Sequence, residues 1–598
     1  MELIAVIAVS AAGAATARRI VAALPGAELH GRDLPDAAVA FADTGAHLRN
    51  LFRQGVPIVG VCAAGILIRA LAPLLADKTA EPPVIAVSAD GAAVVPLLGG
   101  HHGANRLAAR IAERLAGRAA ITTAGDVALG VALDEPPDGW RVADMDAVRP
   151  VAAALLAGEP VRLEVEAGDA AWLGQVAGLG EDGRLGIRVT DHAVDGDDEL
   201  ILHPPVLALG VGCERGVGAA ELIELARASL AEAGLAEGAV ACVASLDLKA
   251  DEAAVHALAA MLAVPARFFT PAELEAEAPR LATPSDAVFR ETGCHGVAEG
   301  AALAAAGPAA ELLLPKAKSA RATCAVARAP RAIDPAMVGR PRGRLFVIGI
   351  GPGDAAWRTP EASRAIAAAS DLVGYAPYLD LLGDATAGKI RHDGAMGAEE
   401  ARARQALDLA AEGRAVALVC SGDAGIYGLA TLVFELLDRE DRPAWNRIET
   451  AVLPGISALQ AAAARAGAMI NHDFCAISLS DLLTPWPVIE RRLRGAADGD
   501  FVVALYNPLS QRRRSQLPAA RDILIGQRPG TTPVILARNL GRTGETLAIT
   551  TLAELDPAAV DMLTVVLIGN SETRAVTRGG RQWVYTPRGY AKKWADVV

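Results

Sequence analysis

The clearest chemical signal in the chain is a glycine-rich turn in its C-terminal half. The turn GIGPGD, residues 349–354, directly follows the apolar run RLFVI. Glycines at alternate positions let the backbone turn sharply and leave its N–H groups open to a ligand, because no Cβ obstructs the approach. In the dinucleotide fingerprint a helix begins inside the loop, whereas here Thr359 and Pro360 predict a later helix start. The turn therefore indicates ligand binding, but not of a dinucleotide.

Two further glycine-rich turns follow apolar runs in the same half. SGDAGIYG, residues 421–428, comes after AVALVC, and LPGISA, residues 453–458, comes after another short apolar run. Ligands of open α/β sheets gather beyond the carboxyl ends of the strands, so we expect the three turns to line one site.

Together with GYAPY (374–378) and YNP (506–508), these turns resemble the tetrapyrrole methylase family, over essentially all of residues 344–598. The GYAPY and SGDAGIYG motifs are similar to the branch that methylates carbon 17 of precorrin-3B. The resemblance implies two α/β lobes with S-adenosylmethionine bound between them, largely through backbone groups. It also implies a tetrapyrrole substrate, ring contraction to precorrin-4 in cobalamin synthesis, and a homodimer formed through this domain.

The resemblance further implies which residues contact the two ligands. Those expected at the methyl donor are Gly351, Pro352, Gly353, Gly422, Asp423, Ile426, Ser457 and Thr564. Those expected at the substrate are Tyr375, Tyr378, Asn507 and Arg538.

Methyl transfer to a ring carbon depends chiefly on holding donor and acceptor in a near-attack geometry. Ring contraction also needs proton movement, and the carboxylates nearest the motifs are Asp354 and Asp423, our candidate catalytic residues. The alternative is that Asp354 caps a turn and Asp423 only accepts hydrogen bonds from the ribose.

A substrate with many carboxylates calls for arginines, because a guanidinium group binds a carboxylate in bidentate fashion. The candidates in this half are Arg512, Arg513, Arg514, Arg538, Arg542 and Arg588. For the three consecutive arginines, a solvated charged loop is the default explanation.

The N-terminal half contains a second group of motifs. GVCAAG (60–65), Asp77 with Lys78, PLLGGHHGAN (96–105) and ITTAGD (121–126) combine glycine turns with histidine and asparagine. The two adjacent histidines have no further ligand at i+3 or i+4, so we predict no metal site.

These segments resemble the N-terminal part of the cobalt-precorrin-5A hydrolase family, which opens a lactone and releases acetaldehyde. Its C-terminal part is similar to residues 206–328, through GVGCERG, ASLDLKADE, TGCHGVAE and LLLPKAKS. For such a hydrolysis our candidate bases are His101 and Glu299, with His295 and Glu252 as further candidates, and Lys249 and Lys316 are candidates to bind carboxylates. For each histidine a role as a turn or core residue is the favoured explanation, and for Cys213 a role as a small buried residue.

Composition excludes several other classes of protein. With 57 basic and 70 acidic residues the net charge is −13, so no overall basic field attracts nucleic acid. The seven cysteines are scattered without a C-x-x-C pair, which favours a reducing, cytoplasmic location. No uninterrupted apolar run reaches the roughly twenty residues needed to span a bilayer, and we see no signal peptide.

The elements that must position these motifs alternate between short apolar runs and longer helical segments. This alternation predicts a multidomain α/β protein with buried, largely parallel strands. We predict an α/β domain at 1–130, a small, partly β domain at 131–204, an α/β domain at 205–330, a linker at 331–343 and the methylase domain at 344–598.

The favoured interpretation is a fusion of two activities of corrin synthesis. One alternative is a cobalt-factor III methyltransferase with an active lactone hydrolase. The other is that the N-terminal half binds or carries a tetrapyrrole without catalysis.

Overall fold

The computed structural model describes residues 3–24, 26–32, 34, 37–75, 81–122, 129–194, 196, 198–510 and 513–590, and for His101 the backbone alone. The chain forms two compact units. The first comprises Met1–Leu345, Leu407–Val416 and Glu440–Glu449, and the second Phe346–Ala406, Ala417–Arg439 and Thr450–Val598. None of the helices described is long and apolar enough to cross a membrane.

The first sheet has the strand order β3-β2-β1-β4-β5-β6-β7. Its elements are β1 (Ile4–Ala8), α1 (Ala11–Ala23), β2 (Ala27–Gly31), β3 (Val39–Ala40), α2 (Thr44–Arg53), β4 (Ile58–Val61), α3 (Ala64–Leu71), β5 (Val84–Val87), β6 (Ala93–Leu98), α4 (Ala104–Leu115) and β7 (Arg118–Ala119). Val6 and Ala8 of β1 join the core under α1 and α4, whereas Ala5 and Ile7 join the core under α2 and α3. Helices on both faces explain why this strand is apolar throughout.

The second sheet has the order β10-β9-β11-β12-β8. Its elements are β8 (Arg141–Val142), α6 (Val148–Leu156), β9 (Val161–Val165), β10 (Leu179–Gly180), β11 (Leu185–Val189) and β12 (Glu199–His203). Alternate residues such as Val161, Ile187 and Leu202 enter one core together with Val151 of α6. A sheet with one covered face accounts for the alternating sequence pattern here.

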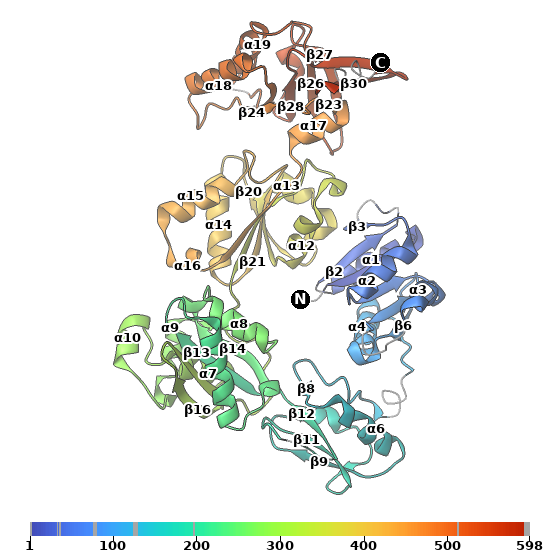
Figure 1. The fold of residues 1–598 in the computed structure, drawn as a ribbon, viewed down its shortest axis with the longest axis vertical. Helices are drawn as coiled ribbons and strands as arrows, with labels where there is room; N and C mark the ends of the chain where they lie inside the picture. Colours follow the sequence, from blue (N-terminus) through green and yellow to red (C-terminus); the bar gives the residue numbers. More distant parts are fainter. Residues whose placement is uncertain are drawn as a thin grey trace. The chain divides into compact units, whose positions relative to one another are not determined.

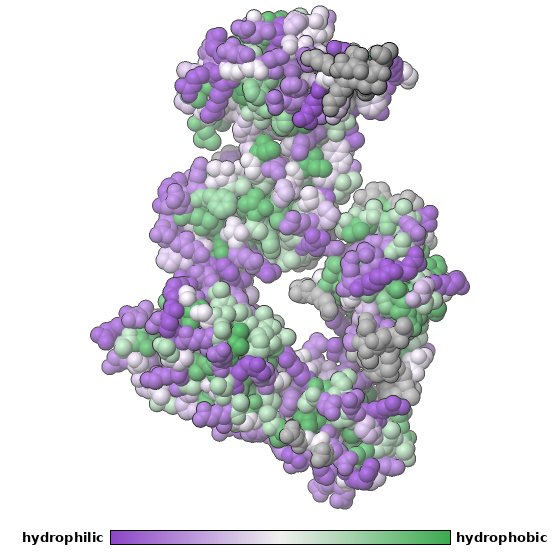
Figure 2. Space-filling view, viewed as in Figure 1, coloured by the Kyte–Doolittle hydropathy of each residue, from purple (hydrophilic) through white to green (hydrophobic). Residues whose placement is uncertain are grey.

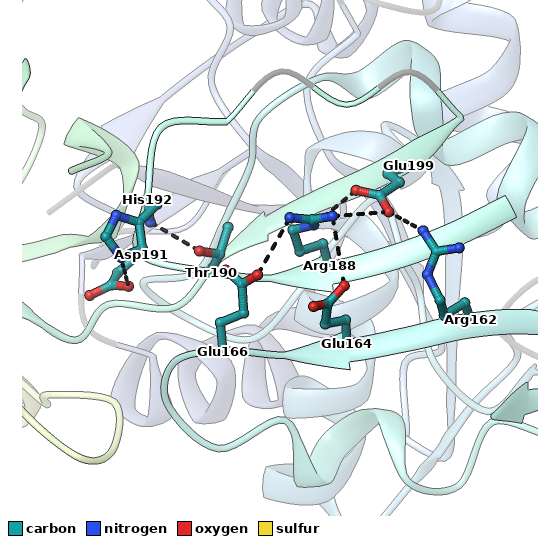
Figure 3. A network of polar contacts seen from close by, with 8 residues as sticks. All are labelled: Arg162, Glu164, Glu166, Arg188, Thr190, Asp191, His192 and Glu199. Carbon is teal, nitrogen blue, oxygen red and sulfur yellow. Dashed lines mark hydrogen bonds and ion pairs between the residues drawn. The ribbon is translucent and has the colours of Figure 1, made fainter. Parts of the chain in front are cut away.

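The other face of this second sheet carries a charged network (Figure 3). Arg188 of β11 bonds to Glu199 of β12 at 2.9 Å and lies 3.7 Å from Glu164 of β9 and 3.4 Å from Glu166. Glu199 also pairs with Arg162 of β9. Opposite charges on neighbouring strands stabilise the register of a sheet, so we assign this network to folding.

The third sheet has the order β15-β14-β13-β17-β16, with β13, β14 and β15 parallel and β17 antiparallel to β13. Its elements are β13 (Leu207–Cys213), α7 (Ala219–Glu232), β14 (Val240–Leu246), α8 (Ala253–Met261), β15 (Ala266–Phe269), α9 (Pro271–Glu275), α10 (Asp286–Thr292), α11 (Val297–Ala306), β16 (Glu311–Lys318) and β17 (Ala322–Arg328). Helices α7 and α8 cover one face and α11 covers the other.

Residues 331–343, for which we predicted a linker, are fastened to the third sheet. The buried guanidinium group of Arg267 in β15 donates to the carbonyls of Val338 at 2.6 Å and Gly339 at 3.0 Å. Arg340 and Phe268 exchange two backbone hydrogen bonds, and Ile333 is buried in the core under α11. The prolines and glycines of this segment interrupt any apolar periodicity, and the sequence therefore predicts a linker. Hydrogen bonds from a buried arginine to backbone carbonyls cannot be predicted from residue types, because every residue has a carbonyl group.

The first lobe of the predicted methylase domain has the sheet order β20-β19-β21-β18-β22. Its elements are β18 (Arg344–Gly349), α12 (Pro360–Ala368), β19 (Asp371–Tyr375), α13 (Ala376–Asp380), β20 (Ile390–Gly394), α14 (Glu399–Ala411), β21 (Ala415–Cys420), α15 (Ala430–Glu440), α16 (Pro443–Asn446) and β22 (Glu449–Leu453). Figure 1 shows α12 and α13 on one side of this sheet and α14 and α15 on the other. The three glycine-rich turns directly follow β18, β21 and β22.

The second lobe has the sheet order β24-β25-β28-β26-β27 and a small sheet β23-β30-β29. Its elements are α17 (Ala458–Ala466), β23 (Gly467–Ala468), β24 (Phe474–Ser478), α18 (Trp486–Asp498), β25 (Val502–Tyr506), α19 (Gln516–Ile525), β26 (Pro533–Arg538), β27 (Thr546–Thr551), β28 (Thr564–Ile568), β29 (Arg574–Arg578) and β30 (Arg581–Tyr585). Helices α18 and α19 pack on one face and α17 on the other. Figure 2 shows a largely hydrophilic surface over α18, whose Ile489 and Leu493 face the core.

The expectation of largely parallel strands is wrong for the second lobe. In its larger sheet only β24 and β25 pair parallel, whereas β25, β28, β26 and β27 pair antiparallel in turn. The connection from β26 to β27 is only residues 539–545, and such a short connection cannot carry the chain back for a parallel pairing. The α/β class itself is confirmed.

The predicted domain boundaries agree with the limits of the sheets but not with the compact units. Inside the predicted methylase domain, Leu407–Val416 and Glu440–Glu449 belong to the first unit. These two segments join the first unit because backbone hydrogen bonds connect them to residues 343 and 344. Arg344 N–H donates to the carbonyl of Arg414, and Glu449 N–H donates to the carbonyl of Gly343. The five-part division therefore stays a prediction.

Candidate functional site

Two of the three glycine-rich turns are joined by backbone hydrogen bonds. Gly351 N–H donates to the carbonyl of Gly422 at 3.1 Å, and Gly422 N–H donates to that of Gly351 at 2.7 Å. Both residues have positive φ, +76° and +70°, which favours glycine at each position. The turn after β18 and the turn after β21 thus form one backbone assembly.

The third turn approaches the first two so closely that a side chain has no room. A Cβ on Gly455 would lie 2.2 Å from the carbonyl oxygen of Gly422 and 2.6 Å from that of Gly349. A Cβ on Gly349 would in turn lie 2.6 Å from the oxygen of Gly422. The glycines at 349 and 455 are therefore a packing requirement of the assembled turns, and the three turns lie together.

The two predicted catalytic carboxylates both accept hydrogen bonds from backbone N–H groups. Asp423 accepts from Gly425 at 2.8 Å and, through its other oxygen, from Gly455 at 3.0 Å, so it links the second turn to the third. Asp354 accepts from Ala356 at 2.9 Å and caps a short 3₁₀ turn. These contacts favour the alternative of a structural role for Asp354, and they make Asp423 a positioning residue for the turns.

Arg542 of the second lobe connects the first two turns with its guanidinium group. Nε donates to the carbonyl of Pro352 at 2.7 Å, and Nη2 donates to Ser421 Oγ at 2.7 Å. A Cβ on Gly353 would lie 2.5 Å from Arg542 Cγ. Burial lowers the pKa of Arg542. The sequence makes this residue one of several candidates for binding a substrate carboxylate, but two of its donors hold the turns themselves.

The two tyrosines of the GYAPY motif lie beside this arginine. Tyr375 and Tyr378 pack edge to face with ring centroids 5.1 Å apart, and the Arg542 guanidinium carbon is 5.6 Å from the centre of the Tyr378 ring. Burial raises the pKa of Tyr378, while the Arg542 charge lowers it. The aromatic part of the predicted substrate site therefore adjoins the predicted donor turns.

Tyr427 is a contact residue that our sequence analysis did not single out, although it lies in the SGDAGIYG turn. Its hydroxyl donates to the carbonyl of Ala476 at 3.0 Å and accepts from Ser478 N–H at 3.1 Å, both in β24 of the second lobe. Its φ is +54°, an unfavourable conformation for a residue with a bulky side chain. The sequence contains one indication of this role, namely a tyrosine at a position of the glycine-rich turn where another glycine would be favoured.

The other residues that we predict to bind the methyl donor differ in their surroundings. Ser457 is buried and caps α17, where it forms a reciprocal capping box with Gln460. Ile426 is 38% exposed within the second turn. Thr564 donates to Asp561 at 2.7 Å in the second lobe, and its side chain is engaged there.

Arg538, predicted to bind substrate, is paired with the same aspartate as Thr564. Its Nε lies 2.7 Å from Asp561 Oδ2. Burial raises the pKa of Asp561, but hydrogen bonds from Arg538 and Thr564 outweigh it, and the net pKa is lowered. An arginine already neutralised by a carboxylate is less available for a substrate carboxylate, which weakens the case for Arg538.

Asn507 has a positive φ of +49° and donates through its side chain to Ser478 Oγ at 3.1 Å. Buried Arg513 donates to the carbonyl of Asn507 and to Ser480 Oγ, both at 3.2 Å, so its guanidinium group supports the YNP turn. Arg514 and Arg588 are exposed, and Arg512 lies outside the described residues.

In the N-terminal half, Glu299 is saturated with hydrogen bonds. It accepts from the N–H groups of Ala282, Thr283 and Lys316 at 2.8, 3.0 and 2.9 Å, and from Thr283 Oγ1 at 2.8 Å. Burial raises the pKa of Glu299, but these hydrogen bonds lower it by more. The net pKa therefore lies below the ordinary value for a glutamate. A carboxylate held ionised and fully bonded is a poor base, so the structure favours a structural role for Glu299.

The other N-terminal candidates are divided between described and undescribed parts of the chain. The side chain of His101, Asp77 with Lys78, and the segment 123–126 lie outside the described residues. His295 is half-buried, and its Nδ1 lies 2.9 Å from Glu275 Oε1 while Phe289 stacks on its ring. No group of three metal-binding side chains occurs among the residues that the structure describes.

Comparison with known protein families agrees with this geometry. The model of the Tetrapyrrole (Corrin/Porphyrin) Methylases matches residues 344–556. The models described as Cobalamin synthesis G N-terminal and Cobalamin synthesis G C-terminus match residues 46–126 and 207–327.

Individual relatives cover mainly the C-terminal part. The chain is 47% identical over 250 residues to a precorrin-3B C(17)-methyltransferase of Sinorhizobium sp, and this match covers 42% of the chain and 98% of that relative. It is 45% identical over 246 residues to a probable cobalt-factor III C(17)-methyltransferase of Salmonella typhimurium, covering 41% of the chain and 99% of the relative. It is 42% identical to the cobalamin biosynthesis protein CobIJ of Mycobacterium bovis, but this match covers 42% of the chain and spans only 48% of that relative.

Two solved structures are similar in sequence to separate parts of the chain. The methyltransferase CobJ is 42% identical, with 41% of this chain and 100% of that chain covered and a TM-score of 0.39. CobE, a protein of the cobalamin pathway, is 42% identical, with 21% and 89% covered and a TM-score of 0.20.

Fold and site thus define a two-lobed α/β protein whose three glycine-rich turns close into one assembly. The chain belongs to the tetrapyrrole methylase family, and its N-terminal half carries the two regions of cobalamin synthesis G. Both resemblances seen in the sequence are confirmed at this level.

Proposed function

We propose that residues 344–598 transfer a methyl group from S-adenosylmethionine to carbon 17 of precorrin-3B, with ring contraction to precorrin-4. The observation that carries this proposal is the assembly of the three turns around the Gly351–Gly422 hydrogen bonds, with Asp423 and Arg542 as supports. It is supported by the 47% identity to a relative of that name, almost the whole of which is covered.

The turns fit the methyl donor because they offer backbone surface without side chains. Positions 349, 351, 353, 422 and 455 are all glycine, and four of them would meet a neighbouring atom within 3 Å if they carried a Cβ. S-adenosylmethionine supplies the electrophilic methyl group. The turns would hold its methionine and ribose parts through backbone groups, and the role of the protein in the transfer is to fix carbon and methyl in line.

Substrate binding by Tyr375, Tyr378 and Asn507 is part of this proposal, supported by the position of the tyrosines beside Arg542. The contacts of Asp354 and Asp423 with backbone N–H groups leave the base for ring contraction unassigned. A homodimer and a cytoplasmic location stay predictions, and all seven cysteines are free thiols.

The test is incubation of the protein with methyl-labelled S-adenosylmethionine and either metal-free precorrin-3B or its cobalt-loaded counterpart. We expect label in the tetrapyrrole and a product with a contracted ring. Transfer only to the cobalt form would replace the proposed substrate by cobalt-factor III, the name carried by the Salmonella relative. Transfer to neither would refute the proposal.

A further inference from the structure

The first compact unit contains a cavity that lies apart from every site discussed so far. Its volume is about 50 Å³, and its walls come from β15 and the end of β14 on one side and from the ends of α14 and α16 on the other. A cavity needs about 10–15 Å³ to hold one water molecule, so there is room for a ligand of about three to five non-hydrogen atoms. All residues of the walls belong to this one unit.

The segment 340–343 holds the two walls of the cavity together. Arg340 and Phe268 exchange two backbone hydrogen bonds, of 2.7 and 2.8 Å. On the other side, the N–H of Glu449 donates to the carbonyl of Gly343 at 2.8 Å. Gly343 also packs so closely against the carbonyl oxygen of Ala410 that a Cβ has no room. Because backbone groups bond to both walls, the cavity is a fixed feature of this unit.

Asp247, which directly follows β14, lines the cavity and has an oxygen without a partner. Its Oδ1 is buried and accepts no hydrogen bond, and its carboxylate forms no ion pair with any residue that the structure describes. Burial raises the pKa of Asp247, and the charges of Arg447 and Arg340 lower it by less. A buried carboxylate oxygen without a donor is costly, so this atom calls for a donor that the chain itself does not supply.

Arg447, which directly follows α16, lines the cavity with an unused guanidinium group. Its side chain donates no hydrogen bond to the described part of the chain and forms no ion pair there. A guanidinium group has five N–H donors. The charge of Arg447 acts on Asp247, yet the two side chains are too far apart for an ion pair. The space between them therefore suits a small molecule that bonds to both.

The charged groups at the cavity restrict the charge of such a molecule. Arg340 is already paired with Glu273 at 3.1 Å, whereas Asp247 and Arg447 contribute one uncompensated charge each. A simple anion is repelled by Asp247 and a simple cation by Arg447, but a ligand with both charges meets an opposite charge at each end. Apolar side chains complete the walls, namely Ala250, Phe268, Ala410 and Ala444.

We propose that this cavity binds a small zwitterionic amino acid of about the size of glycine. The ammonium group donates to Asp247 Oδ1, and the carboxylate accepts hydrogen bonds from the guanidinium group of Arg447, so both bonds are assisted by charge. Arg340 also lines the cavity and its side chain is 43% exposed, so the ligand enters from the surface beside it. The site shares no residue with the glycine-rich turns and does not depend on methyl transfer.

The test is calorimetric titration of the full chain with glycine at neutral pH. We expect saturable binding to one site at glycine concentrations up to about 10 mM, because a ligand of so few atoms binds weakly. Acetate and methylamine each carry only one of the two charged groups. They should bind at least about tenfold more weakly, the factor for one lost hydrogen bond to a charged group. Trimethylglycine is a zwitterion without N–H donors and should not bind.

Variants then assign the binding to the cavity. Asp247→Asn and Arg447→Met should each raise the Kd for glycine about tenfold. Ala250→Leu keeps both charges but fills the cavity, so it should abolish binding. Arg331→Met, at an exposed arginine of the same unit, is the control and should leave the Kd unchanged. Without glycine, Asp247→Asn should not lower the unfolding temperature, because Oδ1 has no partner to lose.

Three results would overturn the proposal. Absence of glycine binding over this concentration range would mean that the cavity holds water alone. Equal affinities for glycine and acetate would show that Asp247 takes no part, and an unchanged Kd in both Asp247→Asn and Arg447→Met would place the binding elsewhere. Methyl transfer can persist in each case, so failure here is distinct from failure of the proposed methyltransferase.

Discussion

Among single residues, Arg542 connects two of the assembled turns. It reaches Pro352 in the first turn and Ser421 in the second, and it lies over the ring of Tyr378. A lysine has one compact donor group and cannot reproduce a planar fork that reaches two acceptors. One side chain from the other lobe thus adds to the backbone hydrogen bonds that hold these two turns.

We predict that Arg542→Met raises the KM for S-adenosylmethionine about tenfold, because two hydrogen bonds to the donor turns are lost. The effect on kcat should be smaller, since the reacting atoms are not contacted. Steady-state kinetics at varied donor concentration measures both parameters. Arg514→Met, at an exposed arginine, is the control and should leave KM unchanged. An unaltered KM in Arg542→Met would contradict the assigned role.

Glu299 allows a prediction about stability and pH. Glu299→Gln should lower the free energy of unfolding by about 2 kcal/mol at neutral pH, because four donors lose a charged acceptor. The pKa of the folded state is lowered, so the stabilisation is complete above the ordinary glutamate pKa of about 4.3. It disappears as the pH falls through the lower pKa of the folded state.

Urea unfolding of both proteins at several pH values checks this prediction. The difference between wild type and Glu299→Gln should be constant from neutral pH down to about pH 5 and shrink below it. A difference that grows on acidification would show that the sign of the pKa shift is wrong.

At the scale of elements, the proposed methyl-donor site consists of three turns that pack against one another through their glycines. The first turn is joined to the second by paired backbone hydrogen bonds. The third turn lies so close to both that a Cβ on Gly455 would clash with their carbonyl oxygens. The hydroxyl of Tyr427 then bonds the second turn to β24 of the other lobe. Strand ends, rather than side chains, thus define the shape of the site.

Gly455→Ala should therefore weaken the binding of S-adenosylmethionine. Its Cβ would lie 2.2 Å from a backbone oxygen, which cannot move aside as a flexible side chain would. Titration with S-adenosylhomocysteine should show at least a tenfold weaker affinity, a loss of about 1.4 kcal/mol. Gly495→Ala in α18 is the control, since nothing lies within 4 Å of that position. Equal affinity of both variants would disprove the packing argument.

The segment 331–343 gives a second prediction at this scale. Arg267→Met removes the bonds to the carbonyls of Val338 and Gly339 and should destabilise the fold by about 2 kcal/mol. Limited proteolysis should then cut within 331–343 faster than in wild type. Arg331→Met, at an exposed arginine of the same segment, should not change the cleavage rate. Rapid cleavage of the wild type would mean that the segment is a free linker.

For the whole molecule, the methylase part should function without the preceding sheets. A chain shortened to residues 340–598 keeps both lobe sheets and the backbone bonds of Gly343 and Arg344. We expect its KM for S-adenosylmethionine to lie within about threefold of the full chain, a difference below about 1 kcal/mol. Shortening to residues 351–598 removes β18 and should abolish activity. Inactivity of the longer fragment would show that the N-terminal half takes part in methyl transfer.

The sequence by itself determined the α/β class, the family and the list of turns, because glycine spacing and apolar periodicity are local properties of the chain. It also indicated that the three turns share one site, since strand ends collect ligands. The sequence does not predict the antiparallel pairing in the second lobe, because buried strands are apolar whichever way their neighbours run.

What only the tertiary structure decided is which polar atoms meet. Asp423 is bonded to Gly455, Arg538 to Asp561, and Glu299 to backbone N–H groups from two other segments. Residue types fix what a side chain can do, whereas long-range contacts fix whether its donors and acceptors are already occupied.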